Sequence, residues 1–187
     1  MLAAALEEKR AQMSGRKQRS LKFVDFVKEG GKGQRRGERA ADDGLGILPT
    51  AGDWVLQADL DRKLIFPEEI AVTNQRPDVV IWSAKTRQVV MIELTVPWEE
   101  RMEEAYERKA ERYSNLRQVC TEKRWKAWCF PVEVGCRGFV SQSMWRMLGA
   151  LGIKGRKRKQ VTKNLTEAAE AASRWLWLKR NAGTWKI

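Results

Sequence analysis

The sequence predicts an α/β fold in which a sheet of four strands packs against helices. Short segments of alternating or β-branched apolar residues predict strands at 53–60, 76–82, 87–96 and 125–134. Longer segments with helical spacing predict a helix at 97–123, between the last two strands, and another at 141–151. This order of strand, strand, strand, long helix, strand and helix is typical of an α/β layer sandwich.

The four strands differ in the burial that their patterns predict. At 53–60 apolar residues recur at every second position, which indicates a strand with one buried face. Segments 76–82 and 87–96 are continuously apolar and are joined by the polar turn 83–86, so we expect a hairpin that is buried on both faces. The fourth segment contains Pro131, which favours an edge strand or a bulge.

Capping residues indicate where the helices begin. Pro97 followed by Glu99 and Glu100 is typical of a helix N-terminus, because acidic side chains favour the positive end of the helix dipole. We therefore expect the long helix to run from Pro97 to about Lys123. Residues 2–12 could form a short helix, and an amphipathic pattern predicts a final helix at 164–180.

The chain of 187 residues fits one domain with tails. We expect a basic N-terminal segment at 1–47, a core at 48–152, and a basic loop followed by the C-terminal amphipathic helix at 153–187. Within the first segment, 20–27 fits a strand or an apolar anchor, and the Gly-rich, charged stretch 28–46 predicts a mobile loop.

Composition excludes several kinds of chemistry. The chain has no histidine, which excludes Ser-His-Asp triads, Cys-His nucleophiles and histidine-bound zinc. Any catalysis must therefore use carboxylates, lysine, tyrosine and a hard metal ion. Three cysteines are too few, and odd in number, for a disulfide framework. No apolar run reaches the roughly 18 residues needed to cross a bilayer, so we expect an intracellular protein that does not enter a membrane.

The net charge of +12 indicates a polyanionic partner, either nucleic acid or an acidic surface. Basic residues cluster at Arg35 and Arg36 in the expected loop, and again at Lys154, Arg156, Lys157, Arg158 and Lys159. Phosphate contacts by these residues would give affinity for DNA without sequence readout. Each run would otherwise be a solvated segment. The second run also fits a nuclear import signal in a eukaryote, whereas a prokaryotic protein would be cytoplasmic.

The clearest local signal is a carboxylate among apolar residues. Along 87–96 side chains alternate between two faces, and both faces are apolar except for Glu93 and Thr95. A turn of even length would put Asp78 and Glu93 on one face, roughly 5 to 8 Å apart. Two carboxylates that close repel each other unless a cation lies between them, and Mg²⁺ or Mn²⁺ would meet this need. Alternatively, Asp78 caps a turn and Glu93 pairs with a basic residue from a helix.

The residue spacing along the long helix predicts a lysine on the face that packs against the sheet. Residues spaced by three or four form one stripe, which comprises Met102, Ala105, Lys109, Tyr113, Leu116 and Cys120. Lys109 lies in the middle of this stripe, with Glu93 and Asp78 as candidate partners. It either forms a structural ion pair with Glu93, or orients an attacking water and stabilises charge on a phosphate.

The hairpin residues resemble the PD-(D/E)xK motif of restriction-like nucleases. Asp78 ends the string RPD, and Glu93, fifteen positions later, begins the string ELT on the next strand. The longer string RPDVVIW…VVMIELTVPWEE…AYERKAERY is similar to the endonuclease domain of site-specific non-LTR retrotransposons. The similarity is close over 76–113 and looser over 50–150. It implies a restriction-endonuclease-like sandwich, with a central mixed four-stranded sheet flanked by helices, and an enzyme that uses a divalent metal to nick DNA.

The resemblance also implies roles for single residues. Asp78 and Glu93 match the metal ligands of the family, and Lys109 matches the lysine that the family carries on the following helix. Thr95 stands where most relatives in the superfamily have lysine, so Lys109 would have to replace that group. Supporting roles would fall to the backbone carbonyl of Leu94 and to Thr95, Tyr113 and Glu99.

Three functional hypotheses follow. The first is an active, metal-dependent DNA endonuclease from or related to a retrotransposon. The second is a catalytically inactive DNA-binding module on the same fold. The third is a Holliday-junction resolvase-like enzyme, which would act as a homodimer. Retrotransposon proteins carry a reverse transcriptase and a zinc knuckle upstream. The chain lacks the length for the first and the ligands for the second, so it is either a fragment or a stand-alone relative.

Overall fold

The computed structural model of the protein describes residues 2–14, 46–60 and 63–181. The helices are α1 (Leu2–Ser14), α2 (Met102–Glu122), α3 (Gln142–Ala150) and α4 (Gly155–Lys179), and the strands are β1 (Val55–Ala58), β2 (Val79–Ser83), β3 (Gln88–Thr95) and β4 (Lys126–Glu133). Short 3-10 helices precede β1 (Leu48–Thr50) and α2 (Glu99–Arg101). The segment 20–27, the expected loop 28–46 except Gly46, and Arg35 and Arg36 lie outside the described residues.

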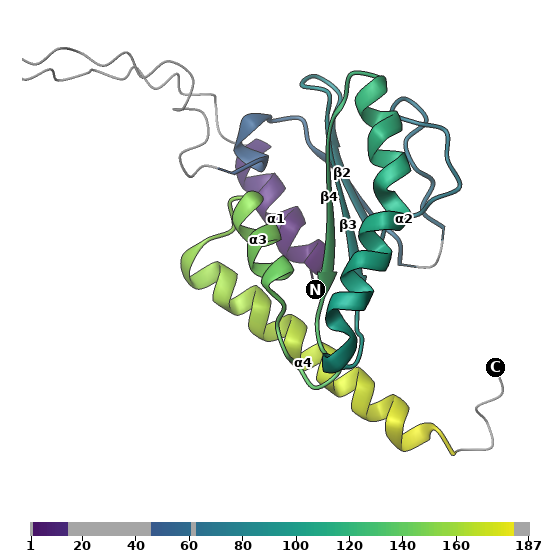
Figure 1. Ribbon diagram of the computed structural model, residues 1–187. Coiled ribbons are helices and arrows are strands. Elements are labelled where there is room, and N and C mark those ends of the chain that lie inside the picture. The colour runs from purple at the N-terminus through teal and green to yellow at the C-terminus, as the bar shows by residue number, and fades with distance from the viewer. Residues whose placement is uncertain (1, 15–45, 61–62, 182–187) are drawn as a thin grey trace, which may run out of the picture.

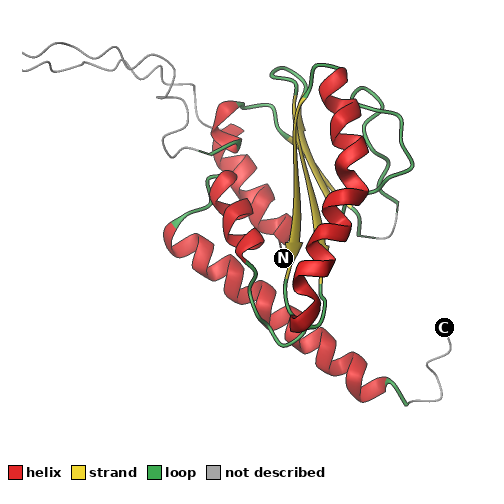
Figure 2. Ribbon diagram, viewed as in Figure 1, coloured by secondary structure: helices red, strands yellow, loops and turns green. Residues whose placement is uncertain are grey.

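The four strands form one mixed sheet in the order β1-β2-β3-β4 (Figure 1). β2 pairs with both β1 and β3 in antiparallel fashion, whereas β3 and β4 are parallel. Helix α2 covers one face of the sheet, and α1, α3 and α4 lie on the other (Figure 2). The prediction of an α/β fold with a central mixed four-stranded sheet flanked by helices is confirmed.

The central hairpin is buried on both faces, as its continuous apolar pattern predicts. Every residue of β2 is buried, and so are five consecutive residues of β3. Val79 and Ile81 pack on the side of α1, α3 and α4. Val80 and Met91 pack on the side of α2. Because side chains alternate along a strand, Glu93 shares the α2 face with Met91.

The outer strands are less buried than the hairpin. β1 alternates between exposed and half-buried residues, as expected for a strand with one buried face. β4 forms one edge of the sheet and contains Pro131. An edge strand tolerates proline because one side of it makes no hydrogen bonds to a neighbour. The predicted edge position of Pro131 is confirmed.

Helix α2 begins at Met102, five residues later than its proline signal predicts. Trp98 has extended backbone angles (φ −61°, ψ 143°), and the 3-10 turn Glu99–Arg101 precedes the α-helix. The two acids after Pro97 therefore lie in this 3-10 turn. Proline and acidic residues indicated the right region but not the right first turn.

Helix α4 begins at Gly155, so the prediction of a basic loop there is wrong. Lys154 is extended (φ −126°, ψ 171°) and directly precedes the helix, which then continues to Lys179. Lysine, arginine and glutamine are good helix formers, and no proline interrupts the segment. The basic cluster therefore lies on the first turns of a helix.

Candidate active site

Asp78 and Glu93 lie opposite each other at one end of the hairpin. The antiparallel register pairs Val79 with Ile92, and one further step puts Asp78 beside Glu93. The backbone N–H of Asp78 donates a hydrogen bond to Glu93 Oε2 at 3.3 Å. The register expected from a turn of even length is therefore the observed one.

Glu93 is 4% exposed and lies between β3 and α2. Its Oε1 accepts a hydrogen bond from Lys109 Nζ in an ion pair. Its Oε2 accepts a second hydrogen bond from the Tyr113 hydroxyl, at 2.8 Å. With the Asp78 N–H, three donors surround this carboxylate. These contacts offset the cost of burying a charged group, which would be several kcal/mol for an isolated carboxylate.

Helix α2 places Lys109 and Tyr113 one turn apart on its buried stripe. The Lys109 side chain is 18% exposed, so the ammonium group lies at the border between the core and solvent. Burial raises the pKa of Tyr113, and the neighbouring Glu93 carboxylate raises it further. The phenol therefore stays protonated, and its O–H donates the hydrogen bond to Glu93. The stripe expected from the sequence is the face that packs on the sheet.

The Asp78 carboxylate has fewer donors than Glu93. The Leu94 N–H donates to Asp78 Oδ2 at 2.6 Å, and among the described residues it is the one donor to this carboxylate. Burial raises the pKa of Asp78, and the Glu93 and Asp59 carboxylates add to the rise. The Leu94 hydrogen bond and the charge of Lys109 act in the opposite direction. Within the described residues, the other oxygen of Asp78 accepts no hydrogen bond.

A third carboxylate, Asp59, continues the row across the sheet. The register pairs Ala58 with Val79, and one step further lies Asp59 beside Asp78. The Asp59 N–H donates to the Asp78 carbonyl at 2.8 Å. The sequence did not indicate Asp59 as a site residue, because alternation along β1 shows only which residues of that strand share a face. The missing information was the pairing of β1 with β2.

Asp59 lies at the margin of the site. Its Oδ1 accepts a hydrogen bond from the Leu64 N–H at 3.0 Å. A cavity of about 390 Å³ opens beside it, lined by 57–60 and 63–65. Within residues 2–14, 46–60 and 63–181, no three Cys, Asp or Glu side chains are grouped so that they could hold a metal ion. Asp78 and Glu93 are the two carboxylates that the register of the hairpin brings side by side.

The remaining supporting residues divide into two groups. Thr95 follows Glu93 on the same face of β3, and its Oγ1 is buried without a hydrogen-bond partner in the described part of the chain. Glu99 instead accepts hydrogen bonds from the Arg137 N–H at 2.8 Å and from Arg137 Nε at 3.1 Å. The structure therefore assigns Glu99 to the loop after β4, not to the support of Glu93.

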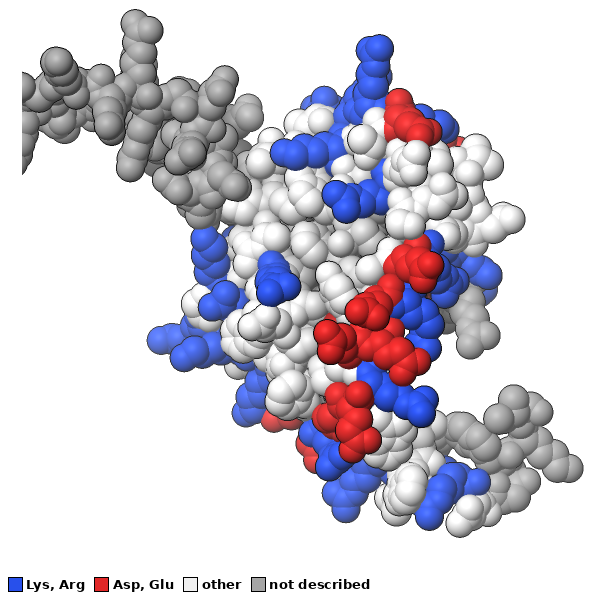
Figure 3. All heavy atoms as spheres, in the orientation of Figure 1, with Lys and Arg blue, Asp and Glu red and all other residues white. Residues whose placement is uncertain are grey.

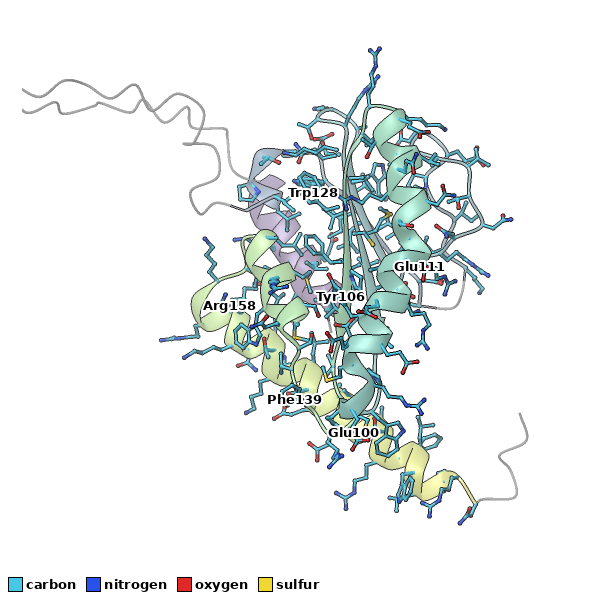
Figure 4. The ribbon with its side chains drawn as sticks, viewed as in Figure 1. Glu100, Tyr106, Glu111, Trp128, Phe139 and Arg158 are labelled. Atoms are coloured by element: carbon cyan, nitrogen blue, oxygen red, sulfur yellow. The ribbon has the colours of Figure 1, made fainter. Side chains whose placement is uncertain are left out.

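The basic cluster on α4 is partly engaged within the protein. Lys157 Nζ pairs with Glu8 of α1 at 2.5 Å. The Arg158 guanidinium lies 4.8 Å from the centre of the Trp145 ring, beside α3 (Figure 4). Lys157 and Arg158, both expected to contact DNA, thus have partners in the fold. The exposed members of the cluster are Lys154, Arg156 and Lys159.

Acidic side chains form a band over α2 on the face that Figure 3 shows. The exposed acids of this helix are Glu103, Glu104, Glu107, Glu111 and Glu122. Basic side chains lie around the band and along α4 (Figure 3). The acidic band would repel an anionic ligand, so such a ligand would reach Asp78 and Glu93 from another side of α2.

No family model matches this chain, and no curated protein matches it. Among the described residues, no helix is long and apolar enough to cross a membrane.

Proposed function

We propose that the protein is a metal-dependent DNA endonuclease with a restriction-endonuclease-like fold, which hydrolyses a phosphodiester bond and nicks one strand. One observation carries the proposal. Asp78 and Glu93 lie opposite each other on a buried hairpin, and Lys109 from α2 contacts Glu93. The net charge of +12 favours a polyanionic substrate.

The donor set fits a hard divalent cation, either Mg²⁺ or Mn²⁺. Asp78 offers its second oxygen, and Glu93 uses three of its roughly four acceptor positions. Leu94 adds a backbone oxygen. Continuing the register one step past Asp78 and Glu93 puts Pro77 opposite Leu94, and proline has no N–H to occupy the Leu94 carbonyl. Two carboxylates and one carbonyl would thus hold the ion at the end of the hairpin.

Each residue of the site then has a definite task. A bound divalent cation supplies positive charge next to the phosphate and makes a bound water more acidic. Asp78 and Glu93 hold this charge in place. Lys109 orients the attacking water and stabilises negative charge on the phosphate oxygens. Tyr113 fixes the Glu93 carboxylate by its hydrogen bond.

Lys109 supplies the charge that Thr95 lacks. Thr95 lies two positions after Glu93 on the same face, and its hydroxyl cannot carry a positive charge. Lys109 approaches the same carboxylate from the helix above the sheet. An ammonium group has three donors. One of them is used by Glu93, which leaves two for water and phosphate.

A catalytically inactive DNA-binding module is the second candidate. The observation that favours it is the engagement of both Glu93 oxygens. A cation would have to share Oε1 with Lys109, which carries the same sign of charge. If the ammonium group excludes the cation, the Lys109–Glu93 pair is a structural ion pair. Calorimetric titration with Mn²⁺ separates the two candidates, because the module would give no binding heat.

The test is nicking of a supercoiled plasmid by the purified chain, with Mg²⁺, with Mn²⁺ and with a chelator. We expect open circles only with metal, and none from Glu93→Gln. Glu111→Gln is the matched control, because Glu111 is exposed on the same helix as Lys109. Cutting in the chelator, or wild-type cutting by Glu93→Gln, would contradict the proposal. Retained DNA binding with neither cutting nor Mn²⁺ heat would support the inactive module.

A further inference from the structure

Two turns lie side by side at the end of the sheet that is remote from the candidate site. One joins β2 to β3 over residues 84–87, and the other joins α2 to β4 over residues 123–125. The Lys126 N–H donates a hydrogen bond to the Arg87 carbonyl at 2.8 Å, and the register pairs Lys126 with Gln88. Figure 1 shows both turns at the end of the sheet opposite the start of α2. Residues that are distant in the sequence therefore form one surface.

This surface is basic. Its exposed cations come from the two turns and from the first residue of β4, and they are Lys85, Arg87, Lys123, Arg124 and Lys126. None of these cations forms an ion pair with a carboxylate of the described residues. The acids beside the turns each accept a hydrogen bond from a neighbour in the fold, namely Asp53 from Ser83, Glu69 from Trp82 and Glu122 from Gln118. Figure 3 shows basic side chains over this end of the molecule, at the top of the view.

Two of these arginines occupy backbone positions that favour glycine. Arg87, the last residue of the β2–β3 turn, has φ 49°, and Arg124, directly after the C-cap of α2, has φ 63°. The hydrogen bond from the Trp125 N–H to the Cys120 carbonyl, at 2.9 Å, makes the second turn a Schellman motif, in which glycine usually takes the position of Arg124. A residue with a Cβ is strained at such angles. Among the described residues, these two arginines are the non-glycine residues with positive φ.

We propose that this surface binds the phosphate backbone of duplex DNA, with Arg87 and Arg124 as its central contacts. Strained residues persist where their side chains serve a function, and the fold puts both strained arginines on the same surface. A guanidinium group presents its donors in a planar fork that matches two oxygens of a phosphate. Neither 83–88 nor 121–126 exposes a large apolar side chain, so these turns offer nothing that would enter a membrane.

The distance to the candidate site fits one continuous duplex. Glu93 lies six residues after Arg87 along β3, which corresponds to roughly 20 Å of extended strand. Successive phosphates of one DNA strand are about 3.4 Å apart along the helix axis, so roughly six of them span the same distance. The choice of DNA as the polyanion rests on the proposed function, whereas the charge and the backbone strain of this surface do not.

Fluorescence anisotropy of a labelled duplex, titrated with the full chain in a chelator, measures binding without requiring cleavage. Arg87→Gly combined with Arg124→Gly should weaken binding by at least about tenfold and lower the salt slope by about 2, near one for each lost phosphate contact. The same double variant should melt at a higher temperature than the wild type, because glycine relieves the strain. Weaker binding together with higher stability is the combination that a purely structural role of the arginines would not produce.

Two further double variants complete the test. Arg146→Gln with Lys163→Gln is the matched control, because it removes two exposed charges from α3 and α4, and it should change affinity and salt slope little. Arg87→Lys with Arg124→Lys keeps both charges and should retain the salt slope. An unchanged affinity in the glycine variant, an equal loss in the control, or a lower melting temperature of the glycine variant would overturn the proposal.

A membrane partner is a separate outcome. If phosphatidylserine vesicles bind the wild type but not the glycine variant, while duplex binding is the same in both, the surface binds lipid headgroups and the proposal fails. The nuclease proposal is tested separately by plasmid nicking. A chain that nicks no plasmid, but loses duplex affinity in the glycine variant as expected, would contradict the nuclease proposal and leave this DNA-binding surface in place.

Discussion

One aspartate lies at each end of strand β2, and the two are held differently. Asp53, beside the turn between β2 and β3, accepts a hydrogen bond from Ser83 Oγ at 2.7 Å and another from the Lys85 N–H at 3.0 Å. Asp78, directly before β2, accepts one hydrogen bond, from the Leu94 N–H. Both oxygens of Asp53 are thus satisfied, while one oxygen of Asp78 has no donor in the part of the chain that the structure describes.

The pKa values of the two aspartates move in opposite directions. Burial acts to raise the pKa of Asp53, but the hydrogen bonds from Ser83 and Lys85 outweigh it and lower the pKa. For Asp78, burial and the neighbouring carboxylates outweigh the single hydrogen bond and raise the pKa. The hydrogen bonds that Asp53 accepts therefore stabilise its charge within the fold. The Leu94 N–H and Lys109 compensate the charge of Asp78 only in part, and a bound cation would compensate it further.

The largest effect should distinguish these two aspartates in catalysis. Asp78→Asn should lower the rate of plasmid nicking by on the order of 10³-fold, because it removes a charged metal ligand. DNA affinity should change little. Asp53→Asn, the matched substitution at the other end of β2, should cut at nearly the wild-type rate once folded. A comparable loss of nicking rate in both variants, or wild-type cutting by Asp78→Asn, would show that Asp78 is not part of the site.

The next effect concerns Lys109. If this residue stabilises the transition state, Lys109→Ala should lower single-turnover cleavage on the order of 10²-fold. If it only neutralises Glu93, the main result should be a loss of about 3 kcal/mol in the free energy of unfolding, since a buried charge would be left alone. Single-turnover rates and thermal melting of the same preparations separate these outcomes. Arg108→Ala, at an exposed neighbouring position, is the control. A variant that melts far lower yet cuts normally refutes the catalytic role.

A moderate effect is expected on stability when metal binds. At a Mn²⁺ concentration about a hundredfold above the dissociation constant, binding should stabilise the fold by about 2.7 kcal/mol. For a chain of this size, that corresponds to a rise in Tm of about 5 to 10 °C. Asp53→Asn should show the same rise and Asp78→Asn none, as differential scanning fluorimetry would reveal. A rise that survives in Asp78→Asn would place the metal elsewhere.

The Asp78–Glu93 pair could be predicted because its register depends on a short turn. Four residues join β2 and β3. Whether the number of residues in such a short turn is even or odd decides which side chains of the two strands share a face. The position of Lys109 follows in the same way from helical spacing. In both cases the relevant geometry is fixed by residues close together in the sequence.

The position of Asp59 and the start of α4 could not be predicted in this way. The chain between β1 and β2 is long, and a connection of that length does not fix the pairing of the strands it joins. The register between β1 and β2, which brings Asp59 beside Asp78, therefore could not be predicted from the sequence. The start of α4 was missed for another reason. Dense positive charge was interpreted as a loop signal, although lysine and arginine favour a helix where no proline or glycine interrupts them.

The smallest effect concerns the stability provided by Asp53. Since its pKa is lowered in the folded state, the ionised carboxylate contributes stability above the unfolded value of 3.8, and this contribution is lost as the pH falls through the lower folded value. Asp53→Asn keeps an acceptor for Ser83 but not for the Lys85 N–H. It should lower the free energy of unfolding by about 1 kcal/mol at neutral pH, and the difference should shrink in acid, once the pH falls below 3.8. Urea unfolding at the two pH values measures it. A difference that persists in acid would mean that the ionised form of Asp53 is not what the fold stabilises, and the contrast with Asp78 would then have to rest on geometry alone.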